Sequence, residues 1–175
     1  MIHYDITMEK SVDRLLQTLP GSESRLKALL KQVEGKYDHI ILDTGPNLNI
    51  STLGSIIASD FLISPSLMRW SSINGYIATR KAVNDMIGFG LSNCQHIGIV
   101  RSMTNVNRDT ETFEVEAYLI KKDIPDLGML PSSSALKSAL YNFQGFDNVK
   151  PHHMQQVEAL LSNILNRISC QTPAL

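Results

Sequence analysis

The sequence predicts an α/β protein in which helices cover both faces of a parallel sheet. Short, continuously apolar segments alternate with segments that repeat apolar residues at helical spacing. The apolar segments lack polar alternation, which is typical of strands buried on both faces. With 175 residues and 43% hydrophobic composition, the chain is long enough to bury one substantial core. We therefore expect a single domain over residues 1–169 and a frayed tail over 170–175.

Four apolar segments are expected to form the strands of this sheet. Each is short and is bounded by polar, glycine or proline residues that favour turns. The expected strands are 39–43, 61–65, 96–101 and 126–131.

The segments between and around these strands predict helices. Residues 22–34 carry apolar side chains at i, i+3, i+4 and i+7, and Gly35 is expected to end that helix. The segment 109–122 begins with the acidic Asp109 and ends with the basic Lys122, so the charges at its two ends match the dipole of a helix. The expected helices are 22–34, 50–59, 71–88, 109–122, 133–143 and 151–169.

Composition and charge limit the classes of function. Sixteen Lys and Arg residues against seventeen Asp and Glu residues give a net charge of -1, so no overall field attracts nucleic acid. No apolar run approaches the ~20 residues of a membrane span, and residues 1–10 lack a signal-peptide core. Cys94 and Cys170 have no metal-like spacing and are expected to be reduced thiols. We expect a soluble, cytoplasmic protein.

The most informative motif follows the first expected strand and consists of Asp43, Thr44, Gly45 and Pro46. A carboxylate at the carboxyl end of a buried strand, followed by a Gly-Pro turn, suits a Mg-nucleotide site. The strand fixes the carboxylate, and the turn keeps bulky side chains away from the phosphates. The phosphate-loop pattern G-x-x-x-x-G-K-[ST] does not occur in the 175 residues. The sequence therefore contains the metal side of a nucleotide site, the residues suited to bind Mg²⁺. It lacks the phosphate side, the loop that binds the phosphates.

Residues 37–65 resemble the Walker B region of the ParA family of partition ATPases, the MinD/ParA-like group with a deviant Walker A loop. The family pattern is an apolar strand, then Asp-Thr-x-Pro, then a helix that ends in Ala-x-Asp. Here it reads as Ile40 to Pro46, followed by Ala58, Ser59 and Asp60. The likeness extends more diffusely from about residue 15 to about residue 165. It implies a P-loop NTPase-like, three-layer fold, here without the phosphate-loop strand.

The resemblance also implies roles for individual residues. Asp43 would support Mg²⁺ and the catalytic water, and residues 44–46 would form the turn that faces the γ-phosphate. Pro131 would lie near the nucleotide base. Arg101 and Arg108 would face DNA. However, residues 101–175 hold seven basic and eight acidic side chains, so most of these charges are expected to form an ordinary solvated surface.

At the level of function, the resemblance implies a partition protein that acts in plasmid or chromosome segregation with ATP and Mg²⁺. It implies dimerisation, a centromere-binding partner, nonspecific DNA contact and association with the nucleoid. Because the phosphate loop is absent, we expect this chain not to hydrolyse ATP alone. Two alternatives stay open: a non-catalytic module that binds a full-length ParA-type protomer or its centromere-binding partner, and a fragment of a split gene. Residues 151–169 contain one Arg and no Lys, which argues against a basic membrane anchor.

Overall fold

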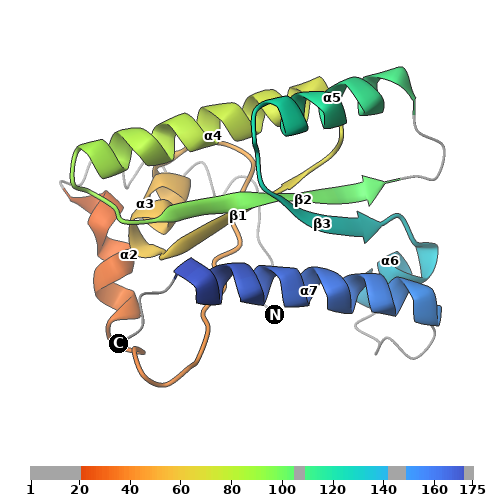
Figure 1. Cartoon of the computed structure of the whole chain (residues 1–175). Helices are drawn as coiled ribbons and strands as arrows, with labels where there is room; N and C mark the ends of the chain where they lie inside the picture. Colours follow the sequence, from red (N-terminus) through yellow and green to blue (C-terminus); the bar gives the residue numbers. More distant parts are fainter. Residues whose placement is uncertain (1–20, 105–108, 142–148, 172–175) are drawn as a thin grey trace. The chain divides into compact units, whose positions relative to one another are not determined.

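The computed structural model describes residues 21–104, 109–141 and 149–171 (Figure 1). The helices are α2 (Ser22–Leu30), α3 (Ile50–Ala58), α4 (Trp70–Gly88), α5 (Thr110–Lys121), α6 (Ser134–Tyr141) and α7 (Pro151–Gln171). The strands are β1 (Phe61–Ser66), β2 (Gln95–Thr104) and β3 (Asp126–Pro131). Every expected helix is found, and the described ends differ from the expected ones by at most four residues. Residues 142–143, where the helix over 133–143 was expected to end, lie outside the described residues.

The three strands form one sheet in the order β1-β2-β3, and β2 and β3 run parallel. The Cα partners include Ile99 with Asp126 and Ser102 with Leu130, and the register shifts twice along the pair. Each successive strand therefore lies beside the one before it, with a helix in each connection. The predicted class, a parallel α/β sheet flanked by helices as in P-loop NTPases, is confirmed.

The expected strand over residues 39–43 was wrong. This segment has no regular secondary structure, and the Ile41 side chain is 91% exposed. An apolar run becomes a strand only when a neighbouring strand accepts and donates its backbone hydrogen bonds. In the part of the chain that the structure describes, β1, β2 and β3 pair only with one another. The segment has the apolar residues of a strand. Among the described residues, however, no neighbouring strand pairs with it.

The expected tail was also wrong at its start. Cys170 and Gln171 belong to the last turn of α7. Residues 172–175 lie outside the described part of the chain. The apolar repeat of α7 extends to Ile168, and the helix continues one turn beyond that residue.

The chain divides into two compact units. The first comprises Met1–Leu62 and Thr79–Gln95, and the second comprises Ile63–Ala78 and His96–Leu175. The single domain over 1–169 stays a prediction.

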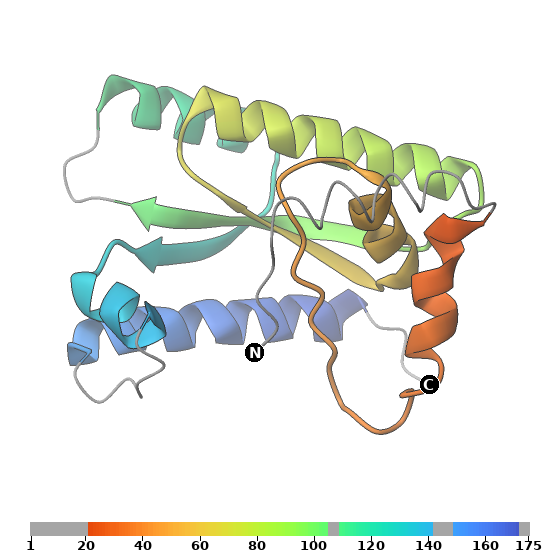
Figure 2. The same cartoon turned by 180° about the vertical axis from the view of Figure 1, so that it is seen from behind.

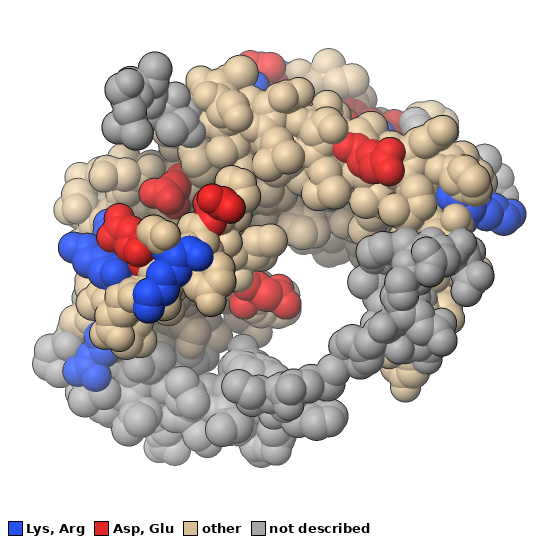
Figure 3. Space-filling model, turned by 90° about the horizontal axis from the view of Figure 1, so that it is seen from below, with Lys and Arg blue, Asp and Glu red and all other residues tan. Residues whose placement is uncertain are grey.

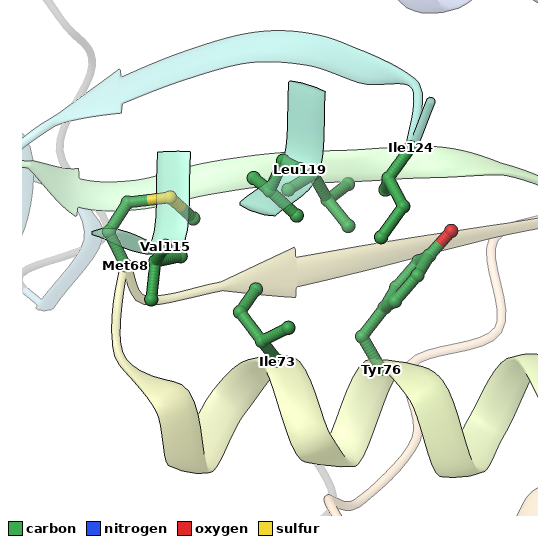
Figure 4. Packing of buried hydrophobic residues seen from close by; sticks show 7 residues of the cluster. Met68, Ile73, Tyr76, Val115, Leu119 and Ile124 are labelled. Atoms are coloured by element: carbon green, nitrogen blue, oxygen red, sulfur yellow. The ribbon is translucent and has the colours of Figure 1, made fainter. Parts of the chain in front are cut away.

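In the second unit, helices cover both faces of the strands. The first half of α4 and helix α5 lie on one face, and α7 lies on the other (Figures 1 and 2). An apolar cluster lies between the strands and the layer formed by α4 and α5 (Figure 4). Its members come from α4, α5, β2 and the connections next to them. Ile73, Ile99 and Val115 are completely buried in it. The cluster comprises Met68, Ile73, Tyr76, Ile99, Val115, Leu119 and Ile124.

On the opposite face, α7 packs closely against β3. A side chain at Gly128 would meet Leu160, since a Cβ there would lie 3.2 Å from the Leu160 Cδ1. Asn163 of α7 donates a hydrogen bond of 3.2 Å to the carbonyl oxygen of Leu127. Glycine therefore allows the helix to approach the strand, and an amide side chain satisfies a carbonyl group at the contact.

The first unit has a smaller core of its own. Ile56 and Ile57 of α3 pack with Val83 and Met86 of α4 and with Cys94. Burial raises the pKa of the Cys94 thiol to about 11, so this thiol stays protonated at neutral pH. Helix α2 packs against α3 in the same unit.

Candidate functional site

The predicted metal-side residues lie in an exposed segment that leads into α3. Asp43 and the three residues after it are exposed and have no regular secondary structure. Asn49 then begins the helix: its side-chain oxygen accepts a hydrogen bond of 2.9 Å from the backbone N–H of Thr52. The segment between Asp43 and the helix start is therefore short, and the carboxylate is accessible to a ligand.

The other predicted site residues belong to the second unit. Pro131 ends β3, with Thr104 as its Cα partner, and Arg101 lies three residues earlier on β2. Arg108 lies outside the described residues. The structure thus keeps residues 43–46 together in the first unit and places Arg101 and Pro131 on neighbouring strands of the second. The roles of these residues stay predictions.

Arg101 is held by two carboxylates. Its Nη1 lies 3.3 Å from the Glu116 Oε1 on α5, and its Nε lies 2.9 Å from the Asp126 Oδ2 at the start of β3. The Arg101 side chain is only 21% exposed. The guanidinium therefore joins α5 to β3, and a contact with DNA phosphate would have to compete with these two ion pairs.

A second group of charges lies where α4 and α5 begin, and we call Arg69, Asp109, Glu111 and Thr112 the α4–α5 charged cluster. The Arg69 Nη1 donates to the Asp109 Oδ1 at 2.7 Å and to the Thr112 hydroxyl oxygen at 3.2 Å. The Arg69 Nε lies 3.5 Å from the Glu111 Oε2. Asp109 also caps α5, since its carboxylate accepts a hydrogen bond of 3.0 Å from the Thr112 N–H. One arginine thus ties the first turns of two helices together.

Trp70 extends this link. Its backbone N–H donates to the Glu111 Oε1 at 2.9 Å, and its indole ring packs edge-on against Tyr118 with the ring centroids 5.3 Å apart. Both helices begin after the carboxyl ends of parallel strands, the edge at which sheets of this class bind ligands. Sequence reasoning recognised Asp109 and Glu111 as favourable to the helix dipole but missed Arg69, which binds both carboxylates. These partners are about 40 residues away from Arg69 in the chain, and no local pattern marks such pairs.

The cluster predicts a pH-dependent contribution to stability. The Arg69 guanidinium, followed by the Thr112 N–H and hydroxyl, lowers the pKa of Asp109. A lowered folded-state pKa stabilises the fold above the unfolded pKa of about 4 and loses that effect as the pH falls through the folded value. We expect Asp109→Asn to lower the urea midpoint at pH 7, and the difference from wild type to narrow below about pH 4. Asp85→Asn, at an exposed carboxylate of α4, is the control. A difference that stays constant between pH 7 and pH 3 would contradict this prediction.

Charges of both signs share the surface seen in Figure 3. Basic and acidic side chains lie near one another on this face, and most of it is neutral. Among the residues described there, no continuous basic surface is visible. The residues described on this face therefore do not form the row of cations with which proteins bind DNA phosphates.

Comparison with known proteins identifies relatives of the chain. The sequence model of a family described as an AAA domain matches residues 1–88, half of the chain. The cell division protein PomZ of Myxococcus xanthus is 32% identical over 71 residues, which are 41% of this chain and 22% of PomZ. The chain spans between 21% and 48% of the length of the curated relatives it matches.

Solved structures show the same fold. The apo form of McdA from Cyanothece superposes with a TM-score of 0.75 at 18% identity, covering 88% of this chain and 64% of McdA. A plasmid partition protein of Borrelia burgdorferi bound to AMPPNP has a TM-score of 0.69 at 19% identity, covering 86% of this chain and 58% of its own. In the described part of the chain, no helix is both long enough and apolar enough to cross a membrane.

Proposed function

Because the chain belongs to the ParA family of partition ATPases, we propose that it acts in plasmid or chromosome partition, with the Asp43 segment as the metal side of a Mg-ATP site. Its matched relatives include a cell division protein and a plasmid partition protein. The observation that carries the proposal is the family match over residues 1–88, which contains Asp43 and the exposed turn before α3. A centromere-binding partition protein and a ParA-type protomer are the partners that this role requires.

The chemistry that the described residues can perform is limited. Asp43 can accept Mg²⁺ or its water ligands through a carboxylate, and residues 44–46 can lie against a phosphate group without bulky side chains. Phosphoryl transfer also needs cations and backbone N–H groups that neutralise the transferred charge. The sequence contains no phosphate-loop motif to supply them. We therefore propose that this chain does not hydrolyse ATP by itself.

The function is tested by segregation in cells. Replacing the chromosomal or plasmid copy with Asp43→Ala should raise the rate of plasmid loss or of anucleate cells to that of a deletion. Asp38→Ala is the matched control, because Asp38 is an exposed carboxylate five residues earlier and outside the motif. A deletion without a segregation defect would contradict the partition role.

The same variants test the chemistry in vitro. The purified chain should release no phosphate from ATP and Mg²⁺ above the buffer rate, in wild type and in both variants. Turnover by wild type that Asp43→Ala abolishes and Asp38→Ala preserves would contradict the proposed lack of hydrolysis. It would also show that a phosphate site is built from residues other than the usual motif.

One observation favours a second role, a non-catalytic module that modulates a full-length ParA-type ATPase or its partner. The apolar segment before Asp43 is open to solvent, with Ile40 at 45% and Ile41 at 91% exposure. Solvent-exposed aliphatic side chains in a strand-like sequence are typical of a surface that binds a further strand. Under this role, a full-length ParA-type protein should co-purify with the chain, and phosphate release should depend on that protein.

A further inference from the structure

Helix α5 carries an apolar stripe on its outer side. Phe113 is 56% exposed and Ile120 is 81% exposed, and Ala117 between them is exposed as well. The spacing of four and three residues places all three on one side of the helix. The opposite side, with Val115 and Leu119, is buried in the core of the second unit. The stripe is therefore a second apolar surface of α5, separate from the side that packs in the core.

The charges beside the stripe have a definite order. Glu114 and Lys121 are both exposed and are seven residues apart, so they lie on the same flank of the stripe about two turns from each other. The acidic residue is near the N-terminal end of the stripe and the basic residue is near its C-terminal end. This flank is complementary to a copy of itself that runs in the opposite direction.

We propose that α5 is a self-association surface on which two copies of this chain pair their helices antiparallel around a twofold axis near Ala117. Phe113 of one copy then lies against Ile120 of the other, and the small side chain of Ala117 allows the helices to approach. In an antiparallel pair, like flanks face each other, so Glu114 of each copy meets Lys121 of the second. Two identical contacts result, as an isologous interface requires.

The size of the surface sets the strength of the dimer. A stripe of three apolar side chains on a 12-residue helix is smaller than the patch of roughly 800 Å² per partner in stable complexes. The expected dimer is therefore weak and depends on protein concentration. It needs no nucleotide, because none of its contacts involves the Asp43 segment. It thus goes beyond the proposed function and does not depend on it.

Charge exchange tests the proposal on the intact chain. In the proposed dimer, position 114 of each copy faces position 121 of the second copy. Glu114→Lys therefore places two lysines opposite each other, and Lys121→Glu places two glutamates opposite each other. Each variant alone should associate roughly tenfold more weakly than wild type. In an equimolar mixture of the two variants, both contacts become Lys opposite Glu again. Sedimentation equilibrium without nucleotide should therefore show wild-type association for the mixture. The double variant Glu114→Lys with Lys121→Glu should also self-associate like wild type.

Matched controls distinguish the loss of this surface from other causes of weaker association. Lys137→Glu, at an exposed residue of α6, changes the net charge by as much as Lys121→Glu and should leave association unchanged. Circular dichroism of each variant checks that α5 still folds, and the mixture gives a readout that loss of folding cannot produce. The proposal is overturned if wild type is monomeric at all concentrations, if it dimerises only with ATP and Mg²⁺, or if the mixture associates no better than its components.

Discussion

Replacing Gly98 with alanine is expected to lower the free energy of unfolding by about 3 kcal/mol. Gly98 lies on β2 with φ at 147°, a backbone conformation that residues with a side chain rarely adopt. A Cβ there would lie 2.5 Å from the Pro125 carbonyl oxygen. That oxygen accepts a hydrogen bond of 2.9 Å from the Ile99 N–H, so it cannot retreat without breaking the link between β2 and the start of β3.

Urea denaturation at pH 7 measures this effect, and Gly75→Ala is the matched control. Gly75 lies inside α4, and a Cβ there would meet no atom within 4 Å. Since alanine favours a helix over glycine by roughly 0.5–1 kcal/mol, this control should be neutral or more stable than wild type. Equal destabilisation by the two substitutions would show that the close approach at Gly98 is not what limits stability.

Replacing Ile73 with alanine is expected to cost about 2–5 kcal/mol of stability. Ile73 is completely buried between α4 and the strands, beside Val115 and Tyr76 (Figure 4). The substitution removes apolar contacts and leaves a cavity that surrounding elements can only partly fill. Because the margin of a domain is roughly 5–15 kcal/mol, this single change removes a large part of it.

The same substitution one turn later on the helix provides the comparison. Ile77 is 40% exposed, so Ile77→Ala keeps the helix propensity change and removes much less buried surface. Thermal unfolding followed by circular dichroism should show a large decrease in melting temperature for Ile73→Ala and a small one for Ile77→Ala. Similar decreases would mean that the buried cluster contributes less than its burial indicates.

The helices and three of the strands could be predicted because their causes are local. Apolar spacing marked α2 and α7, and a continuous apolar run marked β2 between polar ends. Charges at the two ends that match the helix dipole marked α5. Such signals need no knowledge of distant partners, because the residues that produce them are within one or two turns of each other.

The candidate site was only partly predictable. Residues 43–46 could be found because a family motif is a contiguous pattern, whereas the ion pairs of Arg69 and Arg101 join residues from separate elements. Arg101 was expected to face DNA, and its position between Glu116 and Asp126 follows from the packing of α5 and β3 around β2. The sequence shows the charge of such a residue but not its partner.

The sequence by itself determined the helices, three parallel strands and the membership of the ParA family, because spacing and motif are properties of the chain. Tertiary structure decided whether the apolar segment 39–43 forms a strand and whether Phe113 and Ile120 are exposed. Both depend on whether another element covers the side chains or completes the backbone hydrogen bonds. An apolar residue has the same propensity whether or not that neighbour is present, so only the folded arrangement distinguishes a core from a surface that can bind a partner.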